Sequence, residues 1–174
     1  MTITSVWFVE GHPEIVTELG RVTVRWSALD MILVEILSVV LKSHEAAHQI
    51  IFSNNNAGRQ RFQAFQRIIG SSRLDEHTRK EIFAAMTALS ALYGERNAIV
   101  HEPLQTEYSA DGKRIRSSIV AVDRDGKRRK VNIEKLKAHS DEVDVHLHAM
   151  DEISLRLACI HEATFDDDPP PVAQ

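Results

Sequence analysis

Three polar residues near the middle of this 174-residue chain have types and a spacing that suit the cleavage of a phosphodiester. The stretch ALYGERNAIVHEPL, residues 91–104, is apolar at both ends, yet it contains Arg96, Asn97 and His101. An arginine presents a planar fork that fits a phosphate, and a histidine exchanges a proton near neutral pH. An asparagine can donate to a phosphate oxygen or orient the imidazole. These three residues are therefore the candidate catalytic site.

Cleavage of RNA without a metal ion requires groups of these kinds. The ribose 2′-hydroxyl is deprotonated and attacks the adjacent phosphorus, the leaving oxygen is protonated, and the extra negative charge on the phosphorane is stabilised. In this scheme His101 exchanges the protons and Arg96 stabilises the charge. Because the reaction needs an acid and a base, and one chain supplies one such histidine, we expect a symmetric homodimer with a composite site.

A helix predicted from about residue 75 to His101 must position these residues, and Pro103 disfavours helical geometry directly after it. On a helix of about 100° per residue, Arg96 falls inside an apolar arc, and Asn97 and His101 lie together at its edge. The end of a helix favours a protonated histidine, because the helix dipole is negative there. The polar groups therefore border a core or an interface.

Two arrangements of the arginine remain open. In the first, Arg96 pairs with an acid of the first helix, Asp30 or Glu35, and His101 only caps its own helix. In the second, the three residues line a cleft that water and substrate can enter, because a buried charge without a partner is costly.

The segment ERNAIVH, residues 95–101, resembles the Arg-Asn-x-x-x-His motif of the HEPN superfamily. The resemblance implies an α-helical bundle and a metal-independent endoribonuclease without a cofactor, often a toxin or phage-defence effector, usually dimeric. It places Arg96, Asn97 and His101 at the catalytic positions. One branch, whose antitoxin is a small nucleotidyltransferase, has a tyrosine two residues after the histidine. Because Pro103 stands there, silencing through that tyrosine is not implied.

A cationic segment follows the motif, in a chain whose net charge is −4. Such a segment can attract a polyanion, and we expect it to contact RNA; the alternative is a solvated hairpin. Its basic residues are opposed by Asp111, Asp123 and Asp125. The expected RNA-binding residues are Lys113, Arg114, Arg116, Lys127, Arg128, Arg129 and Lys130.

The rest of the chain predicts a mainly α fold, an antiparallel bundle of four to five helices with a small β-hairpin or meander inserted before the last long helix. The meander is expected over about 105–132, because Asp-Gly pairs at 111–112 and 125–126 favour tight turns. We expect a single domain over residues 1–165 and a disordered acidic, proline-rich tail over 166–174. The helices are expected at about 13–42, 44–52, 59–69, 75–101 and 133–165.

The apolar periodicity also predicts which residues are buried. The first helix carries a seam with alternating spacings of four and three, and Val24 and Met31 are expected to widen that seam into a broad buried face. Cys159 lies on an apolar stripe of the last helix and is expected in the core.

A second motif, HEAAH at residues 44–48, matches the His-Glu-x-x-His pattern of zinc proteases. On a helix His44 and His48 would share one face, and Glu45 could activate a zinc-bound water. A catalytic zinc needs a third protein ligand, and only Glu76 and Glu81 could supply one. A zinc hydrolase is therefore an alternative, and a module that binds RNA, a nucleotide or a protein without catalysis is another.

The remaining features restrict the class of protein. A single cysteine excludes an internal disulfide framework. The start of the sequence lacks a secretory signal, and the chain lacks an apolar run long enough to span a bilayer. We therefore expect a cytoplasmic protein with no membrane partner, whose partners are RNA, a second copy and a possible antitoxin protein.

Overall fold

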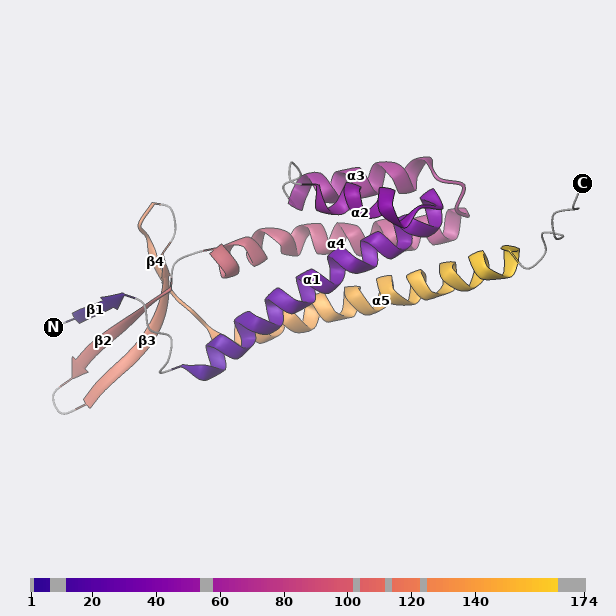
Figure 1. The fold of residues 1–174 in the computed structure, drawn as a ribbon. Coiled ribbons are helices and arrows are strands. Elements are labelled where there is room, and N and C mark those ends of the chain that lie inside the picture. Colours follow the sequence, from indigo (N-terminus) through magenta and orange to yellow (C-terminus); the bar gives the residue numbers. More distant parts are fainter. Residues whose placement is uncertain are drawn as a thin grey trace, which may run out of the picture. The chain divides into compact units, whose positions relative to one another are not determined.

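The computed structural model of the chain describes residues 2–6, 12–53, 58–101, 104–111, 114–122 and 125–165. These residues form five helices and an antiparallel sheet, so the expected mainly α fold with a β insertion before the last helix is confirmed. The helices are α1 (Pro13–Leu41), α2 (His44–Phe52), α3 (Gly58–Ser71), α4 (Glu76–His101) and α5 (Ile133–Phe165) (Figure 1). The strands are β1 (Thr2–Val6), β2 (Leu104–Asp111), β3 (Arg114–Val122) and β4 (Arg128–Lys130). The predicted tail lies outside the described residues.

The chain divides into two compact units. The first, named here the sheet unit, is Met1–Trp26 and Ala91–Asp144. The second, the helical unit, is Ser27–Ser90 and Val145–Gln174. The helices α1, α4 and α5 each contribute one part to each unit. The expectation of one bundle domain stays a prediction.

Polar residues at the start of the helices fix their boundaries. Ser43 is the N-cap of α2, and its hydroxyl accepts a hydrogen bond from the backbone N–H of Ala46 at 3.2 Å. Asp75 accepts hydrogen bonds from both the backbone N–H and the hydroxyl of Thr78 at the start of α4, at 2.9 and 2.7 Å. Asn132 accepts from the backbone N–H of Glu134 at the start of α5, at 2.8 Å. Each cap satisfies donors that the first helical turn leaves unpaired.

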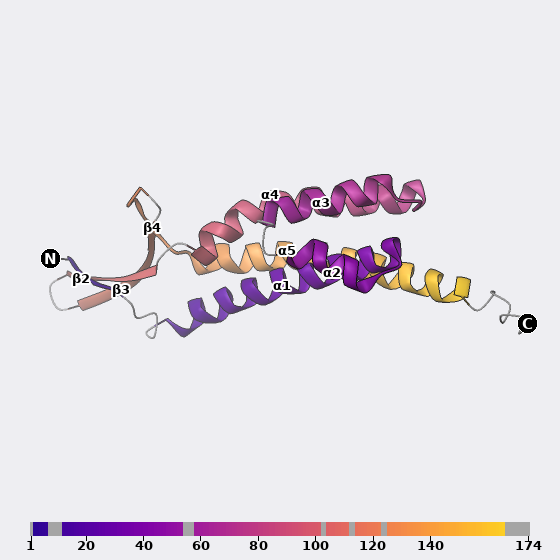
Figure 2. The same cartoon turned by 45° about the horizontal axis from the view of Figure 1, so that its top comes forward.

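The sheet has the strand order β1-β2-β3-β4, and each neighbouring pair is antiparallel. The predicted meander is confirmed as β2, β3 and β4, and both views show β2 and β3 side by side (Figure 2). The sequence did not predict β1, which pairs with β2 from Thr2 opposite Ser109 to Val6 opposite Gln105. Gly126 has a φ of 77°, a left-handed backbone that glycine adopts without strain, in the connection from β3 to β4.

Each unit has an apolar core of its own. In the sheet unit Ile15, Ile119 and Leu136 are buried together, and partly buried apolar residues pack against them. In the helical unit the core is larger and comes from all five helices. Its fully buried large side chains are Leu29, Leu33, Ile36, Leu37, Ile51, Phe65, Ile69, Ile82, Met86, Leu89 and Met150.

Candidate functional site

The last turns of α4 hold the three candidate catalytic residues in the sheet unit. The side chains of Arg96 and Asn97 are half-buried, whereas His101, the final residue of the helix, is exposed. Pro103, which was expected to end the helix, lies outside the described residues. The helix therefore presents one exposed imidazole and two polar groups that solvent partly reaches.

The guanidinium of Arg96 contacts the side chains of both Asn97 and His101. Arg96 Nη1 donates a hydrogen bond to Asn97 Oδ1 at 3.1 Å and lies 3.1 Å from His101 Nε2. Because a guanidinium has no acceptor atom, Nε2 must accept this hydrogen bond, and the imidazole proton then lies on Nδ1. In this arrangement Nε2 of His101 faces the arginine. The expected cluster of three residues exists as one hydrogen-bonded group.

The charge of Arg96 is not neutralised within this group. Neither partner in the group is a carboxylate, and no carboxylate among the described residues forms an ion pair with this guanidinium. Its Nε is buried and has no hydrogen-bond partner among the described residues. A buried donor without a partner costs on the order of 1–3 kcal/mol, so this arrangement does not serve stability. An anion that bound here could accept hydrogen bonds from N–H groups of Arg96 that have no partner within the group.

The acids that were expected to compete for the arginine are engaged elsewhere. Asp30 accepts a hydrogen bond from Arg61 Nη1 at 2.8 Å, and Glu35 accepts one from the hydroxyl of Ser154 at 3.2 Å. Both interactions lie inside the helical unit. Arg96 belongs to the sheet unit, so the first of the two predicted arrangements, in which it pairs with one of these acids, stays a prediction.

A cluster around the buried side chains of Trp26 and His139, which the sequence did not reveal, holds the helix directly before the motif. Trp26 Nε1 donates to His139 Nε2 at 3.5 Å, and the two rings are stacked with their centroids 6.4 Å apart. His139 Nδ1, which then carries the proton, lies 3.3 Å from a carboxylate oxygen of Glu95. Tyr93 meets the other side of Trp26 edge-on, at a centroid distance of 5.7 Å. Two residues of α4 are thereby held against α1 and α5, immediately before Arg96.

Only one sequence signal could have pointed to this cluster. His139 is 4% exposed and lies on the same buried stripe of α5 as Leu136 and Val143, with spacings of three and four. A histidine on an apolar stripe needs a partner, which predicts some buried polar contact. Neither Trp26 nor Glu95 can be identified as that partner from the sequence, because both are far from residue 139 along the chain.

The cationic segment is described only in part. The four consecutive basic residues at positions 127–130 are exposed, and the last three of them form β4. Lys113 lies outside the described residues, and of Arg114 and Arg116 the structure describes only the backbone, in β3. The RNA contacts expected of this segment stay a prediction.

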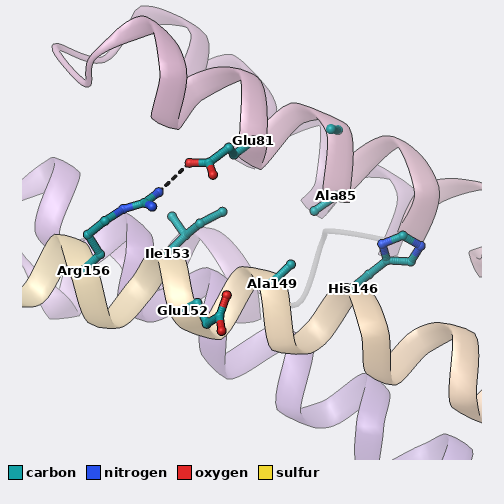
Figure 3. A pocket seen from close by; sticks show the side chains of 8 residues that line it. Glu81, Ala85, His146, Ala149, Glu152, Ile153 and Arg156 are labelled. Carbon is teal, nitrogen blue, oxygen red and sulfur yellow. Dashed lines mark hydrogen bonds and ion pairs between the residues drawn. The ribbon is translucent and has the colours of Figure 1, made fainter.

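A pocket of about 340 Å³ lies in the helical unit between α4 and α5 (Figure 3). Alanines and Ile153 form its apolar wall, and its rim carries an ion pair between Arg156 and Glu81. The Arg-x4-His spacing recurs from this arginine to His161, but no asparagine follows the arginine, which predicts ordinary surface of the last helix; Arg156 is exposed. None of the predicted catalytic residues lines the pocket. The lining residues are Glu81, Ala84, Ala85, His146, Ala149, Glu152, Ile153 and Arg156.

The two histidines of the HEAAH motif lie on one exposed face of α2. The rings of His44 and His48 are stacked with centroids 6.2 Å apart, and His48 also packs on Phe52 at 4.7 Å. The two glutamates that could have completed a zinc site pair with other residues, Glu76 with Lys80 and Glu81 with Arg156. Among the described residues there is no group of three or more His, Cys, Asp or Glu side chains that could hold a metal ion.

Two further findings concern the chain as a whole. Within the described part, every helix is too short or too polar to cross a membrane. Comparisons of the chain with protein-family models, with curated proteins and with solved structures give no match. The function must therefore be argued from the site itself.

Proposed function

We propose that this protein is a metal-independent endoribonuclease of the HEPN type, acting in the cytoplasm as a toxin or phage-defence effector. What supports the proposal is one observation: Arg96, Asn97 and His101 form a hydrogen-bonded group at the accessible end of α4, with no carboxylate among the described residues to neutralise the arginine. The resemblance of ERNAIVH to the Arg-Asn-x-x-x-His motif assigns the same three residues.

The proposed reaction follows from the acceptor and donor atoms of this group. A substrate phosphate draws the guanidinium of Arg96 toward its oxygens, since a charge-assisted hydrogen bond to an anion is stronger than one to a neutral imidazole. This exchange frees Nε2 of His101, which removes the proton of the ribose 2′-hydroxyl. The guanidinium then stabilises the negative charge of the phosphorane. Asn97, which accepts from Arg96 Nη1, orients the guanidinium.

One histidine per chain can act as base or as acid in a single event. In the proposal His101 of a second copy, which must enter the reaction in its protonated form, donates that proton to the leaving 5′-oxygen, so the working site belongs to a homodimer. The basic residues at positions 127–130 contact the RNA backbone. A chain with this activity requires a neutralising partner protein in the cell that makes it, which is the proposed antitoxin.

The test is cleavage of labelled single-stranded RNA by the purified chain and by His101→Ala. We expect the substitution to lower the rate by about 10²- to 10⁴-fold, the usual contribution of a general acid or base. The matched control is His77→Ala, since His77 is an exposed histidine near the other end of α4. Cleavage should continue in EDTA, because no step uses a metal ion.

Three results would count against the nuclease. Equal rates for the parent and His101→Ala place the activity in another site or in a contaminant. Inhibition by EDTA points to metal-dependent hydrolysis instead. Binding of RNA without shortening of the RNA, measured as a mobility shift, supports a binding module without catalysis.

A further inference from the structure

The two histidines of the HEAAH motif, which the proposed function does not use, belong to a longer row of exposed rings on α2. His44, His48 and Phe52 follow one another at intervals of four residues, and all three are exposed. This spacing places them on one side of the helix, over about 12 Å of its length. His48 packs on the rings of both neighbours. The three side chains therefore form a continuous aromatic row at the surface.

The spacing of the two imidazoles suits a flat ligand. Their centroids are 6.2 Å apart, and their planes are inclined by 30°. A base held between two rings needs a separation of roughly 7 Å, twice the contact distance of about 3.5 Å between carbon atoms. A small rotation of either imidazole supplies the difference. Because every nucleobase has a π face, such a row can bind bases with little preference for sequence.

Arginines of the neighbouring helix form a second row. The helix α3 contacts α2, and Arg59 and Arg67 are exposed on it. They are eight residues apart, so they too lie on one side of their helix, about 12 Å from one another. Within the part of the chain that the structure describes, neither guanidinium forms an ion pair, whereas Arg61 between them pairs with Asp30. Both charges are therefore available to an anion.

The stretch that contains both rows is cationic, in a chain whose net charge is −4. Its only acid is Glu45, whose carboxylate accepts a hydrogen bond from Gln49 at 3.4 Å. A cationic region of an acidic chain attracts polyanions to that region alone. The basic residues of positions 36–74 are Lys42, Arg59, Arg61, Arg67 and Arg73.

We propose that α2 and α3 form a binding surface for single-stranded nucleic acid. We name it the α2–α3 surface, and it consists of His44, His48, Phe52, Arg59 and Arg67. Bases stack on the rings of α2, and phosphates accept hydrogen bonds from the arginines of α3. The two rows together select this ligand, because a duplex keeps its bases stacked inside and other polyanions have no bases to stack.

This inference goes beyond the proposed function and does not depend on it. The α2–α3 surface belongs to the helical unit, whereas His101 and the basic residues at positions 127–130 belong to the sheet unit. A chain could bind a strand at this surface without cutting RNA. Every sample below therefore carries His101→Ala and is called the reference chain, so the strand stays intact whether or not the parent cleaves it.

The first experiment is fluorescence anisotropy of a labelled oligouridine of about 12 nucleotides, titrated with the full reference chain. His48→Ala removes the middle ring and should raise the dissociation constant by about 5-fold or more, the usual effect of losing one stacked base. His48→Phe keeps a ring at this position, so its dissociation constant should stay within about 3-fold of the reference value. The substituted position is exposed, so folding survives.

Two further probes separate stacking from charge. A duplex RNA of the same length hides its base faces, so His48→Ala should bind it as the reference chain does. An oligothymidine should lose affinity by the same factor as oligouridine, because stacking needs no 2′-hydroxyl. The proposal is overturned if the reference chain does not bind oligouridine, if His48→Ala binds it equally, if His48→Phe does not recover, or if the duplex shows the same loss.

The second experiment measures the phosphate contacts through salt. Arg59→Gln with Arg67→Gln should lower the slope of log affinity against log salt by about 1.4, since each single-strand phosphate contributes about 0.7. The matched control is Lys80→Gln with Arg156→Gln, which removes two exposed cations from α4 and α5 of the same unit. Its slope should stay that of the reference chain. Equal slopes for the two double variants contradict specific contacts on α3.

The third experiment locates the strand on the chain. An oligouridine that contains 4-thiouridine is photocrosslinked to the reference chain, and the adducts are mapped by mass spectrometry. We expect adducts in α2 or α3. Adducts confined to positions 127–130 would assign all binding to the sheet unit and contradict the α2–α3 surface.

Discussion

The two units of the chain differ in what they bury. The helical unit buries a continuous set of large apolar side chains, and its buried Thr78 and Ser154 both have hydrogen-bond partners. The sheet unit has a smaller apolar cluster and buries more polar groups, among them His139 and Glu18. Of the buried side-chain atoms without a partner among the described residues, four belong to the sheet unit and only Arg61 Nε to the helical unit. The four are Arg25 Nη1, Arg96 Nε, Gln105 Oε1 and Ser140 Oγ.

The two units therefore differ in how completely their buried polar groups are paired. Native proteins satisfy nearly all buried polar groups, and exceptions concentrate where a function requires them. The contrast occurs even within α4. Between residues 76 and 90 this helix buries Ile82, Met86 and Leu89 completely, whereas in its last turns Arg96 and Asn97 are half-buried. We therefore expect stability to depend more on the helical unit, because the sheet unit has more buried polar atoms without a partner among the described residues.

The largest expected effect is in the apolar core of the helical unit. Phe65→Ala removes a side chain that is 0% exposed and should lower the free energy of unfolding by about 3–5 kcal/mol, measured by urea denaturation. Phe52→Ala is the matched control, because Phe52 is 39% exposed. It should cost less than about 1 kcal/mol. If the two substitutions lower the free energy of unfolding equally, the burial of Phe65 does not contribute the expected stability.

A smaller effect is expected from the paired arginine of the helical unit. Arg61→Met keeps the length of the side chain but removes the ion pair with Asp30, in which both side chains are mostly buried. The free energy of unfolding should fall by about 1–3 kcal/mol, the contribution of a hydrogen bond to a charged group.

The matched substitution in the sheet unit is Arg96→Met. It removes a half-buried guanidinium whose Nε has no partner among the described residues, so the free energy of unfolding should change by less than about 0.5 kcal/mol or increase. The same variant should lose RNA cleavage, because the phosphorane then lacks its stabilising charge. If Arg96→Met destabilises the chain as much as Arg61→Met, the proposed separation of stability and function between the units is wrong.

The smallest expected effect concerns the cap of α4. The side-chain hydrogen bond from Thr78, together with backbone N–H groups, lowers the pKa of Asp75 below its ordinary value of 3.8. Because the folded-state pKa is the lower one, this carboxylate stabilises the fold above pH 3.8 and loses its contribution as the pH falls through the lowered value. Asp75→Asn keeps an acceptor but does not titrate. The gap in Tm between the parent and this variant should be about 1 °C near neutral pH and should close in acid.

The sequence predicted the elements with local signals well. The bounds of α2 are those expected, and α1, α4 and α5 agree within one residue at each end, because caps, glycines and apolar periodicity are local features. The strand β1 was missed, since its five residues pair with residues about a hundred positions away and carry no turn signal of their own.

Periodicity also overstated the buried surface. Val24 and Met31 were expected to widen the buried face of the first helix, but they are 68% and 46% exposed. Cys159 was expected in the core and is exposed. A helical stripe shows which residues share a side of the helix, but it does not show how much of that side another element covers. The cluster of Trp26, Glu95 and His139 was also missed, because its residues lie on three different helices and periodicity within one helix cannot predict contacts between helices.

The helix α5 completes both cores, because Leu136 closes the sheet unit and Met150 belongs to the helical unit. During synthesis, neither core is therefore complete until its own part of α5 has left the ribosome. A nascent or truncated product that lacks α5 holds Arg96, Asn97 and His101 on a helix without its buried supports. The candidate site therefore gains these supports only after the first part of α5 has been translated.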